Sequence, residues 1–243
     1  FSGASNGAYR STEDGVTWEL KSAGVITMVH PRVNSFVVNG GSIFAATDIG
    51  LSRSDNNGEN WFPVNNGITS QFVNVLAKNG SDILAGTETG VFVSNDNGNT
   101  WTSIRHGLTD TLVMSLAVRD SVIYAGTWYT GVFASFDYGA NWNPVNNGMP
   151  LITVNALEIN NNAVLAGTYL GISRSSDQGT TWVLTGVSCF PVRSIFPFGD
   201  RTFAGTSLGM FRSFDHGNSW SRKGSTEDTR TVIRNGLTLF AGS

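Results

Sequence analysis

The chain has few cysteines and lysines, and these absences narrow the classes of protein to which it can belong. Cys189 is the only cysteine, so no disulfide can form within the chain. We expect its side chain to be buried as a small apolar residue. Lysine occurs only as Lys21, Lys78 and Lys223, and the net charge is −3. Because nucleic-acid binding needs clustered basic side chains, the sequence argues against a nucleic-acid partner.

Long hydrophobic runs are also missing. No stretch approaches the roughly 18 apolar residues of a transmembrane helix, so we expect no membrane insertion. No charged-then-apolar leader opens the chain, and we expect a mature chain, or a module of a longer one, without its signal peptide. The histidines lie in different repeats without the spacing of metal ligands, so we predict neither a metal site nor a cofactor.

Glycine, by contrast, is abundant. It accounts for 29 of the 243 residues, well above the ~7% that is usual. Such glycine usage indicates many tight turns, as in an all-β protein.

One eight-residue motif recurs along the whole chain. Its clearest copy, Ser-x-Asp-x-Gly-x-Thr-Trp, spans residues 94–101, and the closing tryptophans of successive copies lie 38 to 43 residues apart. A period near 40 residues with short strands is typical of a β-propeller with one blade per repeat. The six closing residues are Trp18, Trp61, Trp101, Trp142, Trp182 and Trp220.

Each repeat has the pattern of four strands. In residues 72–107, two runs of alternating apolar and polar residues flank Asn79-Gly80, a dipeptide typical of hairpins, and Asn39-Gly40 stands at the same place in a sister repeat. An Ala-Gly-Thr-x-x-Gly segment marks the next tight turn. The third strand then runs into the Ser-x-Asp turn, and the tryptophan opens the fourth.

These two motifs together resemble the Asp-box (BNR) repeats of sialidases and of many other propellers, and the resemblance covers essentially the whole chain. It implies a hairpin in which the Asp carboxylate accepts backbone N–H groups and the Trp is buried between blades. Glu13 and Asn56 replace the aspartate in two copies, so we expect those turns to be weaker. The structural aspartates predicted in this way are Asp96, Asp137, Asp177 and Asp215.

The chain begins and ends inside a repeat, because residues 1–5 and 239–243 both match the Ala-Gly-Thr strand. We predict a single propeller domain over residues 1–243, with six blades of four antiparallel strands. Strands from both termini would close the ring and leave no open sheet edge. Part of a seven-bladed propeller is the alternative.

Function is expected where the repeats differ, on the loops between the second and third strands. The loop with Trp128 and Tyr129 has one extra residue and the only tryptophan outside the boxes, and Tyr169 lies in the next repeat. We predict that these aromatics form a platform for a sugar ring or a protein partner. Covering the end of the core is the alternative role. Asp48 and Glu88, in the corresponding loops of other repeats, are the only evident carboxylate pair.

A second variable position lies eleven residues before the Ala of each Ala-Gly-Thr segment. It holds Arg193 and Arg230 in adjacent repeats. If this position faces a central channel, the two guanidinium groups would capture an anion such as a carboxylate. Pairing with the nearby acids Glu227 and Asp228 is the alternative.

The resemblance to sialidases raises the question of catalysis. Sialidase chemistry resides in an arginine triad, a Tyr with a Glu partner and an Asp acid, and no Phe-Arg-Ile-Pro segment precedes the first box. Insertions that would build a deep pocket are missing, since the repeats are nearly uniform in length. We therefore predict a monomeric, non-catalytic extracellular or cell-surface propeller that recognises a glycan or protein partner through its inter-blade loop face. The alternatives are a sialidase-like glycoside hydrolase and a recently amplified or engineered propeller without a selected ligand.

Overall fold

The structure is a computed structural model that describes residues 1–24, 31–150, 152–224, 227–235 and 238–242. Throughout these residues the regular elements are β-strands, and no helix occurs among them. Consistent with this, the described part of the chain has no helix with the length and apolar character of a membrane span. The chain forms two compact units, residues 1–113 with 139–141, and residues 114–138 with 142–243.

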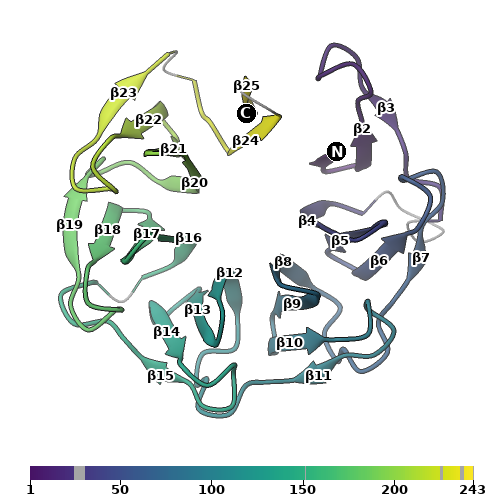
Figure 1. The fold of residues 1–243 in the computed structure, drawn as a ribbon, viewed down its shortest axis with the longest axis horizontal. Coiled ribbons are helices and arrows are strands. Elements are labelled where there is room, and N and C mark those ends of the chain that lie inside the picture. The colour runs from purple at the N-terminus through teal and green to yellow at the C-terminus, as the bar shows by residue number, and fades with distance from the viewer. Residues whose placement is uncertain (25–30, 151, 225–226, 236–237, 243) are drawn as a thin grey trace. The chain divides into compact units, whose positions relative to one another are not determined.

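The first unit contains one three-stranded and two four-stranded antiparallel sheets, β1–β3, β4–β7 and β8–β11 (Figure 1). Its strands are β1 (Ser2–Ala4), β2 (Gly7–Arg10), β3 (Glu19–Leu20), β4 (Val33–Asn39), β5 (Ser42–Thr47), β6 (Gly50–Ser54), β7 (Phe62–Pro63), β8 (Val73–Asn79), β9 (Asp82–Thr87), β10 (Gly90–Ser94) and β11 (Thr102–Ser103).

The second unit contains three four-stranded sheets, β12–β15, β16–β19 and β20–β23, and the separate pair β24–β25. Only Val113, the first residue of β12, belongs to the other unit. The strands are β12 (Val113–Arg119), β13 (Val122–Thr127), β14 (Val132–Ser135), β15 (Asn143–Pro144), β16 (Val154–Asn160), β17 (Ala163–Thr168), β18 (Gly171–Ser175), β19 (Val183–Gly186), β20 (Val192–Phe198), β21 (Arg201–Thr206), β22 (Gly209–Ser213), β23 (Ser221–Lys223), β24 (Thr231–Asn235) and β25 (Thr238–Gly242).

The Ala-Gly-Thr segments form the most buried strands. Every residue of β17 is buried, because both faces of this strand are covered by protein. A Cβ atom added at Gly167 would lie 2.6 Å from Cγ1 of Val192 on the neighbouring sheet. Glycine is therefore needed here to let adjacent sheets approach closely. The sheet order β16-β17-β18-β19 follows the chain, as the four-strand repeat predicts.

The Ser-x-Asp turn after β18 is held by its own side chains. Ser175 Oγ donates to Asp177 Oδ1 (2.7 Å), and Thr181 donates from its backbone N–H to Oδ1 (2.8 Å) and from its hydroxyl to Oδ2 (2.6 Å). These bonds, first among them the Thr181 hydroxyl, lower the pKa of Asp177 to about 2. The Ser-to-Asp bond recurs at Asp96, Asp137 and Asp215.

The turn with Asn56 differs in one respect. Its amide oxygen accepts from Ser54 Oγ (3.0 Å) and from the backbone N–H of Asn60 (2.9 Å). The hydroxyl bond made by Thr181 has no counterpart, because Asn56 has a single oxygen and Asn60 has no hydroxyl. This turn therefore makes fewer bonds than the complete ones.

Four closing tryptophans are buried, namely Trp61, Trp101, Trp142 and Trp182. The Trp101 indole donates to the carbonyl of Val64 in the preceding repeat (2.9 Å). Trp18 departs from the prediction, since 44% of it is exposed and its indole donates to Gly15 in its own turn. Trp220 is also only partly buried, and its indole likewise donates within its own turn, to the carbonyl of Gly217 (3.2 Å).

Candidate functional site

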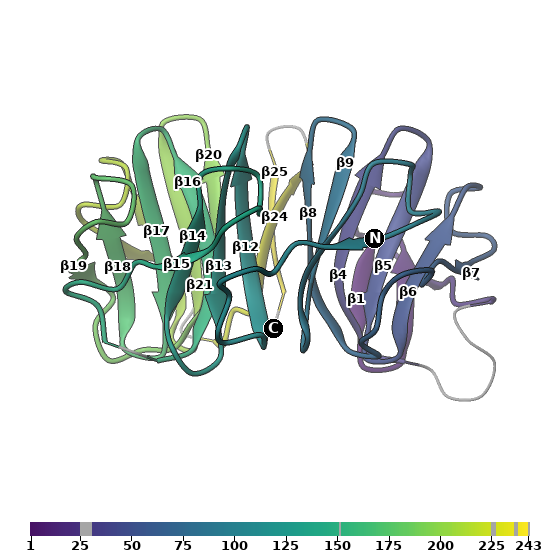
Figure 2. The ribbon, with the colours of Figure 1, turned by 90° about the horizontal axis from the view of Figure 1, so that it is seen from below.

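The strands of the three larger sheets in the second unit run alongside one another (Figure 2), so their turns gather at two opposite ends. Because neighbouring strands are antiparallel, the β12–β13 and β16–β17 turns share one end with the Ser-x-Asp turn after β18. We call this the box end. The β13–β14, β17–β18 and β21–β22 turns lie at the other, which we call the loop end.

The buried threonine of each Ala-Gly-Thr segment shapes a loop-end turn. Thr168 Oγ1 donates to the carbonyl of Gly171 (3.1 Å) and accepts from the N–H of Leu170 (3.1 Å). Gly171 has φ +126°, a conformation that favours glycine. The two residues between them, Tyr169 and Leu170, are both exposed. The hydrogen bonds of the threonine thus hold the turn, and the two residues in its middle are left exposed.

The β13–β14 turn is one residue longer. Both the N–H and the hydroxyl of Thr127 donate to the carbonyl of Gly131 (2.9 and 3.0 Å). Trp128 and Tyr129 project from this turn with their ring centroids 6.4 Å apart, edge to face. The Thr153 hydroxyl donates to the carbonyl of Trp128 (2.7 Å) and anchors the backbone there.

Together these turns present four large exposed side chains at the same end of neighbouring sheets. Their exposed fractions lie between 38% and 66%. The third turn of this end, Ser207-Leu208, exposes no large apolar side chain among the described residues. We refer to Trp128, Tyr129, Tyr169 and Leu170 as the aromatic face.

Cys189 lies beside this face, where its N–H donates to the carbonyl of Leu170 (3.0 Å). The prediction that it is buried is wrong, because its side chain is exposed and its backbone has φ +71°. It lies in the turn between β19 and β20, and turns run mostly over the surface of a protein.

The predicted carboxylate pair lies in the first unit. Asp48 and Glu88 occupy the turns of sheets β4–β7 and β8–β11 that correspond to the loop end. Glu88 is exposed, whereas Asp48 Oδ1 is buried without a hydrogen-bond partner in the described structure. No ion pair of either carboxylate is found among the described residues.

The position of Arg193 is a β-bulge, since the pairing of β20 with β21 shifts between Val192 and Ser194. At the equivalent bulge of β16, Asn155 Nδ2 donates to the carbonyl of Val192 on the next sheet (3.3 Å). This structural role of the position was missed by sequence reasoning, although the recurrence of asparagine there, as Asn34, Asn74 and Asn155, was a usable signal.

Asp228 lies between the two predicted arginines. Arg193 Nε is 2.9 Å from Asp228 Oδ1, and Arg230 Nε is 3.5 Å from Oδ2. Both guanidinium groups therefore face a carboxylate of the chain itself. An incoming anion would have to compete with Asp228 for them.

No group of three His, Cys, Asp or Glu side chains within the described ranges is arranged to hold a metal ion.

Residues 1–111, less than half of the chain, match the family model of the DUF6242 beta propeller domain. No curated protein matches the sequence. Among solved structures, the extracellular domain of the one component system BT4673 from B. thetaiotaomicron aligns with 99% of this chain and 35% of its own, at 16% identity and a TM-score of 0.79. This chain thus spans about a third of that protein.

Two further structures widen the comparison. YCF48 bound to D1 peptide aligns over 90% of this chain and 76% of its own, with 13% identity and a TM-score of 0.70. The GH74 xyloglucanase from Xanthomonas campestris aligns over 90% of this chain and 42% of its own, with 16% identity and a TM-score of 0.64. At such identities the likeness concerns the fold. The chain has the all-β fold of a β-propeller, consistent with six blades of antiparallel strands.

Proposed function

We propose that this chain is a non-catalytic, extracellular or cell-surface binding propeller of the Asp-box type, and that a glycan or protein partner docks on its aromatic face. The observation that carries the proposal is the exposure of Trp128, Tyr129, Tyr169 and Leu170 at two neighbouring turns. Hydrogen bonds of the buried threonines to the carbonyls of Gly131 and Gly171 close these turns. Exposed apolar side chains gathered at one place are typical of a binding surface.

Both partner classes suit this chemistry. An aromatic plane stacks on the C–H face of a sugar ring, and Trp and Tyr also anchor protein interfaces. Leu170 adds an aliphatic surface, which favours a protein partner. Two of the structural neighbours support parts of the proposal, because one is an extracellular domain and another binds a peptide.

A glycan-array screen tests the carbohydrate partner, with the purified chain beside Trp128→Ala. Phe214→Ala is the matched control, because Phe214 is an exposed aromatic residue at the box end of the same unit. We expect glycan binding that is lost in Trp128→Ala and kept in Phe214→Ala. If none of the three proteins binds a glycan on the array, the proposal of a carbohydrate partner is wrong. A peptide array with the same variants would then test the protein partner.

The alternative of glycoside hydrolysis is favoured by the likeness to a xyloglucanase and would use Asp48 and Glu88. We expect no release of reducing sugar from xyloglucan or from sialyllactose by the purified chain. Release that disappears in Glu88→Gln would establish catalysis and contradict the proposal.

We also propose that residues 1–243 form a single monomeric domain closed by strands from both termini. The pairing of β1 with β2, for example Ser2 opposite Tyr9, provides one of the terminal strands. Light scattering during gel filtration tests the monomer, and a mass of twice the 26.0 kDa of the chain would contradict it.

A further inference from the structure

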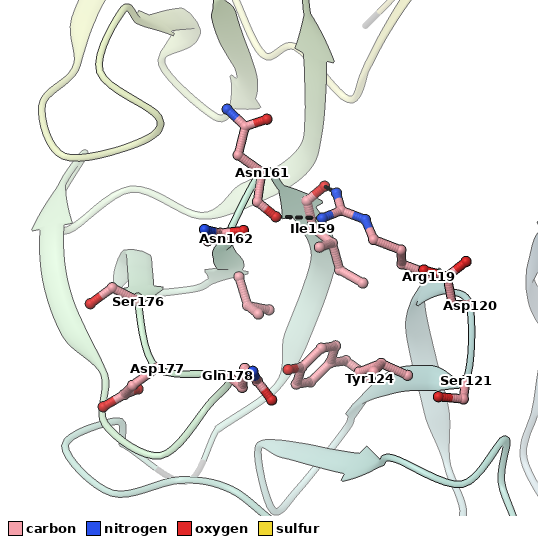
Figure 3. A pocket seen from close by; sticks show the side chains of 12 residues that line it. Arg119, Asp120, Ser121, Tyr124, Ile159, Asn161, Asn162, Ser176, Asp177 and Gln178 are labelled. Atoms are coloured by element: carbon pink, nitrogen blue, oxygen red, sulfur yellow. Dashed lines mark hydrogen bonds between the residues drawn. The ribbon is translucent and has the colours of Figure 1, made fainter.

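A polar cavity lies at the box end of the second unit, between the sheets β12–β15 and β16–β19 (Figure 3). Its volume is about 540 Å³, within the range of ~300–1,000 Å³ usual for small-molecule sites. The β12–β13 turn, the β16–β17 turn and the Ser-x-Asp turn after β18 form its walls. We call it the box cavity, and it lies at the opposite end of these sheets from the aromatic face.

Tyr124 points its hydroxyl into this cavity from β13 (Figure 3). The residue is only 2% exposed, and its ring packs edge to face with Phe136 at a centroid distance of 6.4 Å. The hydroxyl makes no hydrogen bond to any described residue. Because the ring is buried while the hydroxyl faces the cavity without a bond to the described protein, the hydroxyl can bond to a ligand there.

The hydroxyl acts as a donor. Burial, followed by the negative charge of Asp177, raises the pKa of Tyr124 to about 12. The phenol therefore keeps its proton at neutral pH and can donate it to an acceptor in the cavity.

The charges around the cavity disfavour an anion. Arg119 is its one basic lining residue, and its guanidinium donates to the backbone carbonyls of Ile159 (2.8 Å) and Asn161. Asp120 and Asp177 add two carboxylates to the lining, one from the β12–β13 turn and one from the Ser-x-Asp turn. A phosphate or carboxylate would meet repulsion there without a free cation to balance it.

The remaining groups suit a neutral ligand with many hydroxyls. Ser121, Ser176, Asn162 and Gln178 provide hydroxyl and amide groups that can both donate and accept. An apolar part of the wall is formed by Val122, Ile159 and Val164. A pyranose ring has the complementary chemistry, with one C–H face and a rim of hydroxyls.

We propose that the box cavity binds a single neutral pyranose unit, free or at the end of a glycan, with the Tyr124 hydroxyl donating to a sugar oxygen. This site is separate from the aromatic face and does not depend on it.

The test is a titration of the ¹⁵N-labelled full chain, followed by amide chemical shifts. The probes are methyl α-D-mannopyranoside, methyl β-D-glucopyranoside, methyl β-D-galactopyranoside and N-acetyl-D-glucosamine, with D-glucuronate as the anionic counterpart. We expect at least one neutral sugar to shift the amides of Ser121, Asn162 and Gln178, and glucuronate to bind at least tenfold more weakly.

Two variants make the titration specific. Tyr124→Phe removes one oxygen and should weaken sugar binding by about tenfold or more, as expected when a buried hydrogen bond to a ligand is lost. Trp128→Ala, at the loop end, should leave the affinity of the box cavity unchanged. Because the hydroxyl has no partner in the free protein, Tyr124→Phe should leave Tm unchanged or raise it.

Three results would overturn this inference. The first is the absence of shifts at the box cavity with all four neutral sugars, including the case in which only amides near Trp128 respond. That last pattern would still support the proposed function of the aromatic face. The second is an unchanged affinity of Tyr124→Phe, and the third is a clearly lowered Tm of this variant, which would assign the hydroxyl a structural bond.

Discussion

The two ends of the sheets in the second unit use the same kind of frame for different purposes. At the box end, Asp177 and Asp215 each accept bonds from a serine and from the residue four positions later. At the loop end, Thr168 and Thr206 each close a turn onto a glycine carbonyl. The box end also repeats its tryptophan, whereas the residues between the loop-end threonine and glycine differ from sheet to sheet. The exposed side chains at the loop end can therefore vary without loss of the hydrogen bonds that hold the turn.

Removing a box tryptophan should have the largest effect on stability. Trp182 is buried, packs in the core of its unit and donates its indole N–H to Val145 (2.7 Å). We expect Trp182→Ala to lower the free energy of unfolding by about 3–5 kcal/mol. The matched control is Trp18→Ala, because Trp18 stands at the same box position but is half-exposed. It should cost about 1 kcal/mol or less, and urea unfolding of both variants measures the difference. Equal losses would mean that burial does not set the role of these tryptophans.

The sequence was sufficient to predict the elements whose cause is local. The Ser-x-Asp turns and the Asn79-Gly80 hairpin follow from residues close together in the chain. The extent to which each closing tryptophan is covered was not predictable, since Trp18 and Trp220 hold the same motif position as the four buried ones.

The candidate sites divide in the same way. The exposure of Trp128 and Tyr129 follows from an insertion in a turn, which a repeat alignment reveals. The box cavity could not be predicted in this way. The sequence around Tyr124 indicates only a strand, because the cavity depends on the packing of the adjacent sheet. Only the packing of β13 beside the β16–β17 turn places its hydroxyl at the cavity.

The second prediction concerns the dependence of folding stability on pH. Glu158 on strand β16 and Asp177 at the box end contribute to it with opposite signs. Burial raises the pKa of Glu158 to about 7 from its ordinary 4.5, although the charge of Arg119 opposes this. The folded protein then holds a proton that the unfolded chain releases. Stability from this group is present below about pH 4.5 and is lost as the pH rises through 7, by up to about 3 kcal/mol.

The box aspartates act the other way, because the pKa of Asp177 lies at about 2, below its ordinary 3.8. Their contribution is present above about pH 4 and is lost as the pH falls towards 2. We therefore expect Tm to be highest near pH 4–5. Glu158→Gln should match the wild type at pH 4 and exceed it at pH 8 in thermal unfolding. A variant with the same decline between pH 5 and 8 would show that Glu158 is not the source.

At the loop end, Trp128→Ala should have a small effect on stability. The side chain is partly exposed, and the backbone anchor from Thr153 does not involve the indole. We expect a loss of less than about 1 kcal/mol in the free energy of unfolding, while partner binding disappears. Urea unfolding and the array are measured on the same protein preparation. A loss as large as that of Trp182→Ala would indicate that Trp128 covers the core, and that the two ends do not divide stability and binding between them.

The smallest effect is expected from completing the weak box of the first unit. The double substitution Asn56→Asp and Asn60→Thr supplies a second carboxylate oxygen and the hydroxyl that bonds to it, as in the pair Asp177 and Thr181. Both positions are exposed, so water competes for the new bond and the gain should stay below about 1 kcal/mol. The single Asn56→Asp is the control, since it adds the charge without the hydroxyl. A higher Tm of the double variant at pH 7 that vanishes near pH 2 would identify the charge-assisted bond as its cause. A gain that persists at pH 2 would instead assign it to the change of residue at position 60.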